Sequence, residues 1–174
     1  ASSDNTKSIL EKNNIPFFTH EHTGYGGNLF FGLKKAFEKG ATHVIEIHGD
    51  GQYDLNRIID VEKMLNDDKN IDLILGNRFY EYKKPLENKM GLIKFFGNIG
   101  VTFIASIGLG IRSRDLFPGF RVYSKNFYDS LNFEKLSKYY WFSFEIIALS
   151  VFNKLKIRDI PADCDYKTEH TSMS

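Results

Sequence analysis

The chain has 174 residues, of which 42% are hydrophobic and 26% are charged, and its formal net charge is +1 at pH 7. This length and composition are typical of one globular domain with a buried core, and they exclude a disordered or fibrous protein. A net charge near zero gives no reason to expect nucleic acid as a partner. Cys164 is the single cysteine, which excludes an internal disulfide framework and fits a reducing compartment.

Strands and helices alternate along the first half of the chain. In chain order we expect a helix over residues 7–12, a strand over 15–20, a glycine-rich loop over 22–27, a helix over 28–39, a buried strand over 44–47, a helix beginning near residue 55 and a strand over 71–76. This alternation is typical of a mostly parallel sheet covered by helices on both faces. Because the chain opens at helix-capping residues, we expect the first βα unit of that sheet to be missing.

Residues 90–111 are almost wholly apolar, and Lys94 and Asn98 are the chief exceptions. The segment is long enough for a membrane span, but its glycines and Lys94 argue against a simple spanning helix. We expect two broken helices that pack on the sheet, with contact to a membrane interface and a true span as the alternatives. A strand at residues 122–123, a helix over 143–153, a strand over 157–161 and a polar tail complete the chain.

The segment His48-Gly49-Asp50-Gly51-Gln52-Tyr53-Asp54 follows the buried strand at 44–47. An acidic residue between two glycines at this place lies where open α/β sheets bind ligands, and the glycines allow the backbone to approach a ligand closely. The carboxylate of Asp50 and the amide oxygen of Gln52 are suited to a hard divalent cation that carries a diphosphate. The alternative is an Asp-Gly turn that only joins the strand to the next helix.

Two arginines and one further carboxylate are expected near Asp50. Arg78 directly follows a strand, and Arg121 follows the turn Pro118-Gly119-Phe120. Two arginines beside a metal-binding carboxylate suit a diphosphate or a phosphate acceptor, whereas the alternative is that each arginine pairs with a nearby carboxylate such as Asp115. Asp115 is itself a candidate general base, or else the N-cap of a turn.

In this order the segments resemble family-2 glycosyltransferases, the inverting GT-A class, and especially the branch of polyprenyl-phosphate (dolichyl-phosphate) sugar transferases. The matching segments are residues 2–6 (the end of DDGSxDxT), 24–36 (NxGxGxA), 48–54 (the DxD-type metal motif), 76–78 (G-S/N-R), 115 with 119–121 (DxxxGFR), and 160–161 with 166–174 (ExPxxYRxxxSS). In two respects the chain departs from the family pattern. His48 replaces the first motif aspartate, and the opening strand and acidic pair that hold the nucleotide base and ribose are absent.

The resemblance implies that residues 1–174 form a single catalytic domain of GT-A fold, without its N-terminal strand and base-binding segment. It implies a nucleotide-sugar donor whose diphosphate is bridged to Asp50 and Gln52 by Mg²⁺ or Mn²⁺. Arg78 and Arg121 would contact donor or acceptor phosphates, and Asp115 would be the base for a hydroxyl acceptor. The metal ion and the arginines would stabilise the departing nucleoside diphosphate.

The expected reaction is transfer of the sugar, with inversion, to a polyprenyl or dolichyl phosphate at the cytoplasmic face of a membrane. The apolar block at residues 90–111 and the polar tail favour this lipid acceptor. The alternatives are a family-2 enzyme that acts on a glycan or another hydroxyl acceptor, and a non-catalytic GT-A-like scaffold. Without the base-binding segment, the chain on its own is expected to bind donor poorly and to be inactive.

Overall fold

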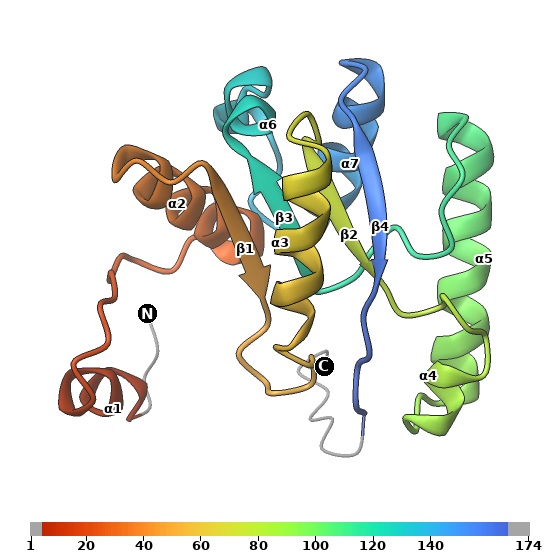
Figure 1. Ribbon diagram of the computed structural model, residues 1–174, viewed down its shortest axis with the longest axis horizontal. Coiled ribbons are helices and arrows are strands. Elements are labelled where there is room, and N and C mark those ends of the chain that lie inside the picture. Colours follow the sequence, from red (N-terminus) through yellow and green to blue (C-terminus); the bar gives the residue numbers. More distant parts are fainter. Residues whose placement is uncertain (1–4, 167–174) are drawn as a thin grey trace.

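The computed structural model describes residues 5–166, and its centre is a four-stranded mixed sheet (Figure 1). In spatial order the strands are β1 (His43–Ile47), β3 (Phe120–Ser124), β2 (Leu73–Asn77) and β4 (Ile157–Pro161). β3 is antiparallel to both β1 and β2, and β2 is parallel to β4. The fold class is therefore α/β as expected, and the sheet is mixed: β1, β2 and β4 run in one direction and β3 runs against them.

The reversed direction of β3 follows from the connection that precedes it. In chain order the helices are α1 (Thr6–Lys12), α2 (Gly24–Glu38), α3 (Arg57–Asp67), α4 (Lys84–Glu87), α5 (Leu92–Leu109), α6 (Lys125–Ser130) and α7 (Phe142–Phe152), with the 3-10 turn η1 at Phe133–Lys135. α5 carries the chain away from the end of β2, and residues 110–119 bring it back to the same end (Figure 1). β3 thus begins beside the end of β2 and runs the opposite way.

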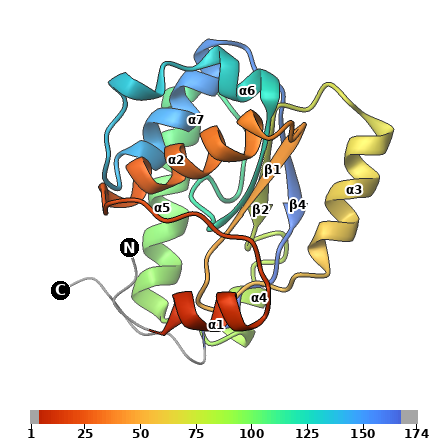
Figure 2. The same ribbon diagram turned by 90° about the vertical axis from the view of Figure 1, so that its left-hand side faces the viewer.

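Helices cover both faces of the sheet, as the alternating pattern predicts (Figure 2). Because side chains alternate between the faces of a strand, Leu73, Leu75 and Tyr123 pack with α2, α6 and α7 on one face. On the other face Ile74 and Val122 pack with α3 and the first half of α5. The sheet is thus buried between two apolar layers, and the site residues lie at its edge.

Two expectations for the N-terminal region are wrong. Residues 15–20 form no strand, because they find no strand to pair with in the described chain, and the side chains of Ile15 and Phe18 remain about half exposed. The expected glycine-rich loop is instead the first turn of α2. A Cβ atom on Gly26 would lie 2.7 Å from Phe142, so glycine allows this turn to pack closely against α7.

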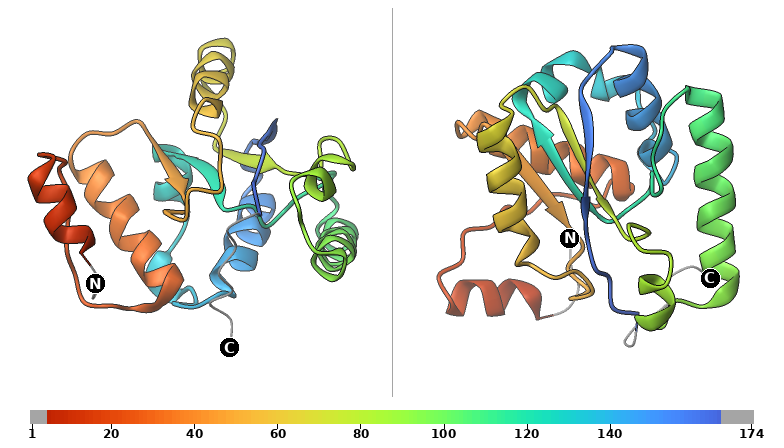
Figure 3. Two further views of the ribbon diagram at one scale, coloured as in Figure 1. Left: turned by 90° about the horizontal axis from the view of Figure 1, so that it is seen from below. Right: turned by 45° about the vertical axis from the view of Figure 1, so that its right-hand side comes forward.

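α5 is one continuous helix and not two broken ones, and it stands beside the β4 edge of the sheet (Figure 3). It ends at Gly110, whose φ of 67° is the left-handed conformation that glycine favours at a helix C-terminus. Burial within the domain, the favoured expectation, is wrong for most of the helix: only Phe95, Thr102 and Ala105 are buried. By length and composition α5 is also apolar enough to cross a membrane.

Candidate active site at the carboxyl end of the sheet

Asp50 lies in the loop that joins β1 to α3, and its carboxylate is exposed. Its Oδ1 accepts a hydrogen bond from the backbone N of Gln52 at 3.0 Å, and Gly51 adopts a φ of 72°. The Asp-Gly turn considered as the alternative is therefore present. Asp50 Oδ2 lies 3.9 Å from Nδ1 of His48, and both side chains are almost half exposed. The turn thus uses one carboxylate oxygen and leaves the second accessible to a ligand.

The same loop is held against the end of the described chain. The backbone O of Gln52 accepts from Asp165 N at 2.8 Å, and its side-chain Oε1 accepts from Cys164 Sγ at 3.5 Å. Tyr53 forms an isolated antiparallel bridge with Cys164. Cys164 is buried, in agreement with a structural role. Gln52 is therefore placed beside Asp50 by contacts from a segment more than 100 positions away.

His48 and Tyr53 hold the loop against Gly119, the residue two positions before Arg121. The hydroxyl of Tyr53 accepts from Gly119 N at 2.7 Å. A Cβ atom on Gly119 would lie 2.7 Å from the ring of His48, so the ring packs directly on the glycine backbone. Burial raises the pKa of Tyr53 above its usual range. A side chain at residue 119 would therefore have to displace the ring of the first residue of the Asp50 loop.

Arg78 and Asp115 form a buried ion pair at the end of β2. Arg78 Nε and Nη2 donate to the two oxygens of Asp115 at 2.6 and 2.8 Å, and the backbone N of Arg78 donates at 3.1 Å. Arg78 also donates to Tyr166 OH at 3.1 Å and to Asn98 Oδ1 at 3.2 Å. Burial lowers the pKa of Arg78, but the hydrogen bonds and charge of Asp115 outweigh it and hold this pKa well above its usual range.

This ion pair is the arginine–carboxylate pairing that the sequence left open as the alternative. The Arg78 guanidinium contacts two residues from other segments that matched the family pattern separately, Asp115 and Tyr166. Both oxygens of Asp115 are engaged, and its side chain is 1% exposed. The roles of Arg78 at a phosphate and of Asp115 as a base remain predictions.

Arg121 lies in a different cluster, across the sheet pairing of β3 with β1. It stands opposite Glu46, and its Nη1 lies 3.8 Å from Glu46 Oε2. The same Nη1 donates to Tyr25 OH at 3.2 Å and to Ser143 Oγ at 3.3 Å. Glu46 also accepts from the hydroxyls of Tyr25 and Tyr123, at 2.6 and 2.5 Å. Burial is the main cause that raises the pKa of Tyr25 to about 12.

Sequence reasoning missed Glu46 and Tyr25 as partners of Arg121, and it gave Tyr53 and Tyr166 no role beyond their places in the matched segments. Glu46 had a usable signal, because a charged residue inside an apolar strand needs a buried partner. The tyrosines carried no such signal in the sequence. Arg121 is 1% exposed, and its Nε has no hydrogen-bond partner among residues 5–166. Contact of Arg121 with a phosphate therefore remains a prediction.

The loop residues fit a hard divalent cation that is held partly by its substrate. No group of three or more His, Cys, Asp or Glu side chains within residues 5–166 could hold a metal ion by itself. Mg²⁺ is commonly bound by one or two carboxylates together with substrate phosphates and water. The exposed carboxylate of Asp50 and the amide of Gln52 can supply such a half-site, and no lysine or arginine among the described residues forms an ion pair with Asp50.

Two curated proteins are similar to this chain. One is the UDP-N-acetylglucosamine–dolichyl-phosphate N-acetylglucosaminyltransferase of Methanococcus voltae, 33% identical over 158 residues, which are 88% of the chain and 59% of that enzyme. The other is the uncharacterized protein MJ1222 of Methanocaldococcus jannaschii, 31% identical over 99% of the chain and 70% of that protein. The chain thus spans less than two thirds of the M. voltae enzyme. No protein-family profile and no solved structure matches the chain.

Proposed function

We propose that the chain is a glycosyltransferase that moves a sugar from a nucleotide-diphosphate donor to a polyprenyl or dolichyl phosphate, a proposal supported by its 33% identity to the Methanococcus voltae enzyme over 88% of the chain. The name of that relative, which specifies a UDP-linked sugar and a dolichyl-phosphate acceptor, supports both substrate classes. The mixed sheet would be part of a GT-A fold. A single in-line displacement by the acceptor phosphate would invert the anomeric carbon.

The contacts of Asp115 are the observation that favours a lipid phosphate over a hydroxyl group as the acceptor. A hydroxyl acceptor must lose a proton, and Asp115 was the best candidate to take it. Both of its oxygens accept hydrogen bonds from Arg78, and its side chain is buried. This carboxylate is badly placed to receive a proton. A phosphate acceptor is already an anion and needs no base, so it suits the site better.

The donor is expected to bind at the exposed loop after β1. When bound there, Mg²⁺ or Mn²⁺ would neutralise the diphosphate and stabilise its departure. Asp50 and Gln52 would hold the cation, and the packing of His48 and Tyr53 on Gly119 would keep the loop in place. Contact of Arg78 with a phosphate would require it to exchange its bonds to Tyr166 and Asn98, because its other donors face Asp115.

We place the reaction at the cytoplasmic face of a membrane. The exposed apolar side of α5 supports contact with a membrane, since Ile93 and Ile104 are 93% and 72% exposed. A helix with one such face can lie in the interfacial region of a bilayer, where a lipid phosphate acceptor would be within reach of the sheet edge.

The test is metal-dependent binding of a nucleoside diphosphate, measured by calorimetry with UDP and GDP in parallel on the whole protein that contains this chain, for wild type, Asp50→Asn and the control Asp54→Asn. The control makes the same change in the same loop, where Asp54 only caps the turn to Asn56. We expect binding that needs Mn²⁺ or Mg²⁺ and is lost only in Asp50→Asn. Equal binding by both variants would contradict the donor site. No binding by any folded form would favour the scaffold alternative.

Transfer to the acceptor is tested separately on the same whole protein, with a labelled nucleotide sugar and polyprenyl phosphate. Label should move into the lipid phase with wild type and Asp54→Asn. Transfer to an oligosaccharide and not to the lipid would favour the glycan acceptor instead.

A further inference from the structure

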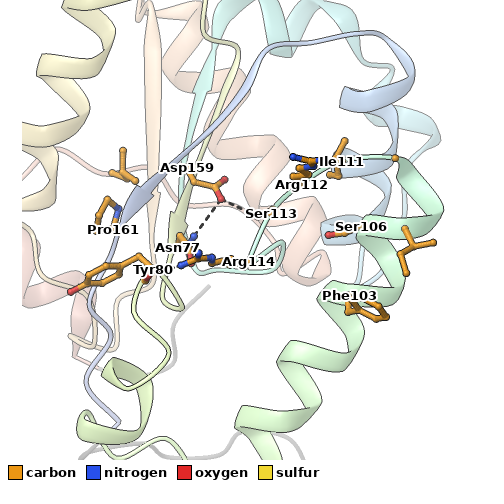
Figure 4. A pocket seen from close by; sticks show the side chains of 13 residues that line it. Asn77, Tyr80, Phe103, Ser106, Ile111, Arg112, Ser113, Arg114, Asp159 and Pro161 are labelled. Carbon is orange, nitrogen blue, oxygen red and sulfur yellow. Dashed lines mark hydrogen bonds between the residues drawn. The ribbon is translucent and has the colours of Figure 1, made fainter.

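A cavity of about 730 Å³ lies between the C-terminal half of α5 and the β4 edge of the sheet (Figure 4). Its walls come from α5, from the segment that leaves α5, from the end of β2 and from β4. None of the residues proposed to bind donor or metal lines it. The lining residues that matter here are Phe103, Ile107, Arg112, Ser113, Arg114 and Asp159.

Arg112 and Arg114 bring two positive charges to this cavity, and neither has a carboxylate partner among residues 5–166. Arg112 forms no hydrogen bond or ion pair with other residues in the range 5–166, and its side chain is exposed. Arg114 donates to the carbonyl of Tyr80 at 2.8 Å, and its guanidinium lies 5.4 Å from the ring of Tyr82. Both of these partners are uncharged, so each arginine keeps its full charge available for a ligand.

Asp159 is the acidic residue in the lining, and it does not pair with the arginines. It reaches from β4 toward Ser113 and Asn77 and accepts from them at 3.1 and 3.4 Å (Figure 4). Burial raises the pKa of Asp159 to about 6. With both arginines charged and Asp159 ionised above that pH, the lining carries a net charge of +1. One negative charge on a ligand would neutralise it.

The cavity opens onto the apolar side of α5. Phe103 and Ile107 line it and are 64% and 67% exposed. The same helix exposes further apolar residues along its length: Leu92, Ile93, Phe96, Val101 and Ile104. At about 1.5 Å per residue, a helix of this length extends for about 27 Å. An apolar surface of this size that ends at two arginines without an ion pair in the described part of the chain matches the change from acyl chains to phosphates at a membrane surface.

We propose that this cavity binds the head group of an anionic membrane phospholipid. The phosphodiester would contact Arg112 and Arg114, the head-group hydroxyls would face Ser113 and Asp159, and the acyl chains would lie along Phe103 and Ile107. A lipid with one net negative charge matches the net charge of the lining, whereas a zwitterionic lipid leaves it unneutralised. This site is separate from the proposed donor site and does not depend on the proposed reaction.

The test is flotation of the full chain with vesicles, comparing the pair Arg112→Gln/Arg114→Gln with the control pair Lys63→Gln/Lys69→Gln. Both pairs lower the net charge by two. Lys63 is on α3, well away from α5 (Figure 3), and Lys69 follows that helix; both are exposed. The vesicles contain phosphatidylcholine alone, or with about 30% phosphatidylglycerol, a level that gives an anionic surface.

We expect phosphatidylglycerol to strengthen binding of wild type and of the lysine control. The arginine pair should lose about 30-fold of that affinity, which corresponds to about 2 kcal/mol for two cations near an anionic surface. Equal losses in the two pairs would mean that net charge alone is responsible and would overturn the site. Equal wild-type binding to both kinds of vesicle would also overturn it. Competition by millimolar inorganic phosphate would overturn the lipid assignment in favour of a soluble anion.

Discussion

The buried ion pair of Arg78 with Asp115 gives the sharpest test of how the site is held together. In Arg78→Met the carboxylate of Asp115 stays buried and loses both guanidinium hydrogen bonds. Removing one partner of a buried pair typically costs 3–5 kcal/mol, because the other charge is left uncompensated. We therefore expect Arg78→Met to lower the free energy of unfolding by about 4 kcal/mol, a large share of the ~5–15 kcal/mol that holds a typical domain.

The double variant Arg78→Met/Asp115→Leu should lose much less free energy of unfolding than the sum of the losses in the two single variants. Replacing a whole buried pair by apolar side chains of similar size is often close to neutral. The chain also offers a more accessible pair for comparison, Arg57 with Asp163 at 3.1 Å, whose side chains are 27% and 32% exposed and whose loss should cost less, about 1 kcal/mol. Arg78→Lys keeps the charge without the two-pronged geometry and should fall between these limits.

Urea unfolding of these variants, followed by circular dichroism, measures the coupling. Additivity of the two single changes within about 0.5 kcal/mol would refute the reasoning, because residues in direct contact should couple far more strongly. A single variant as stable as wild type would refute it as well.

Two further predictions follow from close contacts and from burial. Gly119→Ala places a Cβ 2.7 Å from the His48 ring and should cost about 1–3 kcal/mol in urea unfolding, with most of the loss recovered in Gly119→Ala/His48→Ala; no recovery would contradict the contact. Burial raises the pKa of Asp159 to about 6 in the folded chain, so the folded state holds this proton more tightly than the unfolded state. The Asp159 carboxyl therefore stabilises the folded state below about pH 4. This stabilisation, up to about 2–3 kcal/mol, is lost as the pH rises to about 6. In urea unfolding between pH 4 and 7, Asp159→Asn should not show the loss of stability with rising pH that wild type shows. Identical pH profiles for the two proteins would contradict this prediction.

The regular part of the fold could be predicted because local sequence pattern decides it. β1, β2, β4 and the helices α1, α3 and α7 lie close to their predicted positions, since each is an apolar run or a periodic face bounded by capping or turn residues. The direction of β3 could not be predicted, because it depends on where α5 and the segment after it lead the chain. The strand expected at residues 15–20 failed for a related reason, since a strand needs a partner that local pattern does not supply.

The candidate site was predicted in its residues better than in its contacts. Asp50 and Gln52 lie together in an exposed turn, as their spacing indicates. The sequence could not show whether Arg78 pairs with Asp115 or contacts a phosphate. An ion pair and a phosphate site both need an arginine at this position. The exposure of α5 could not be predicted either. An apolar helix has the same sequence pattern whether it packs on a sheet or faces outward.

The guanidinium of Arg78 joins residues that lie 37 and 88 positions away along the chain. Closing such long loops costs conformational entropy before the contacts between their ends can stabilise the chain. We therefore expect these long-range contacts to form late in folding. The ion pair should therefore be largely absent from the folding transition state. Its loss would then accelerate unfolding and leave the refolding rate nearly unchanged, so that this one side chain governs how long the folded domain persists more than how quickly it forms.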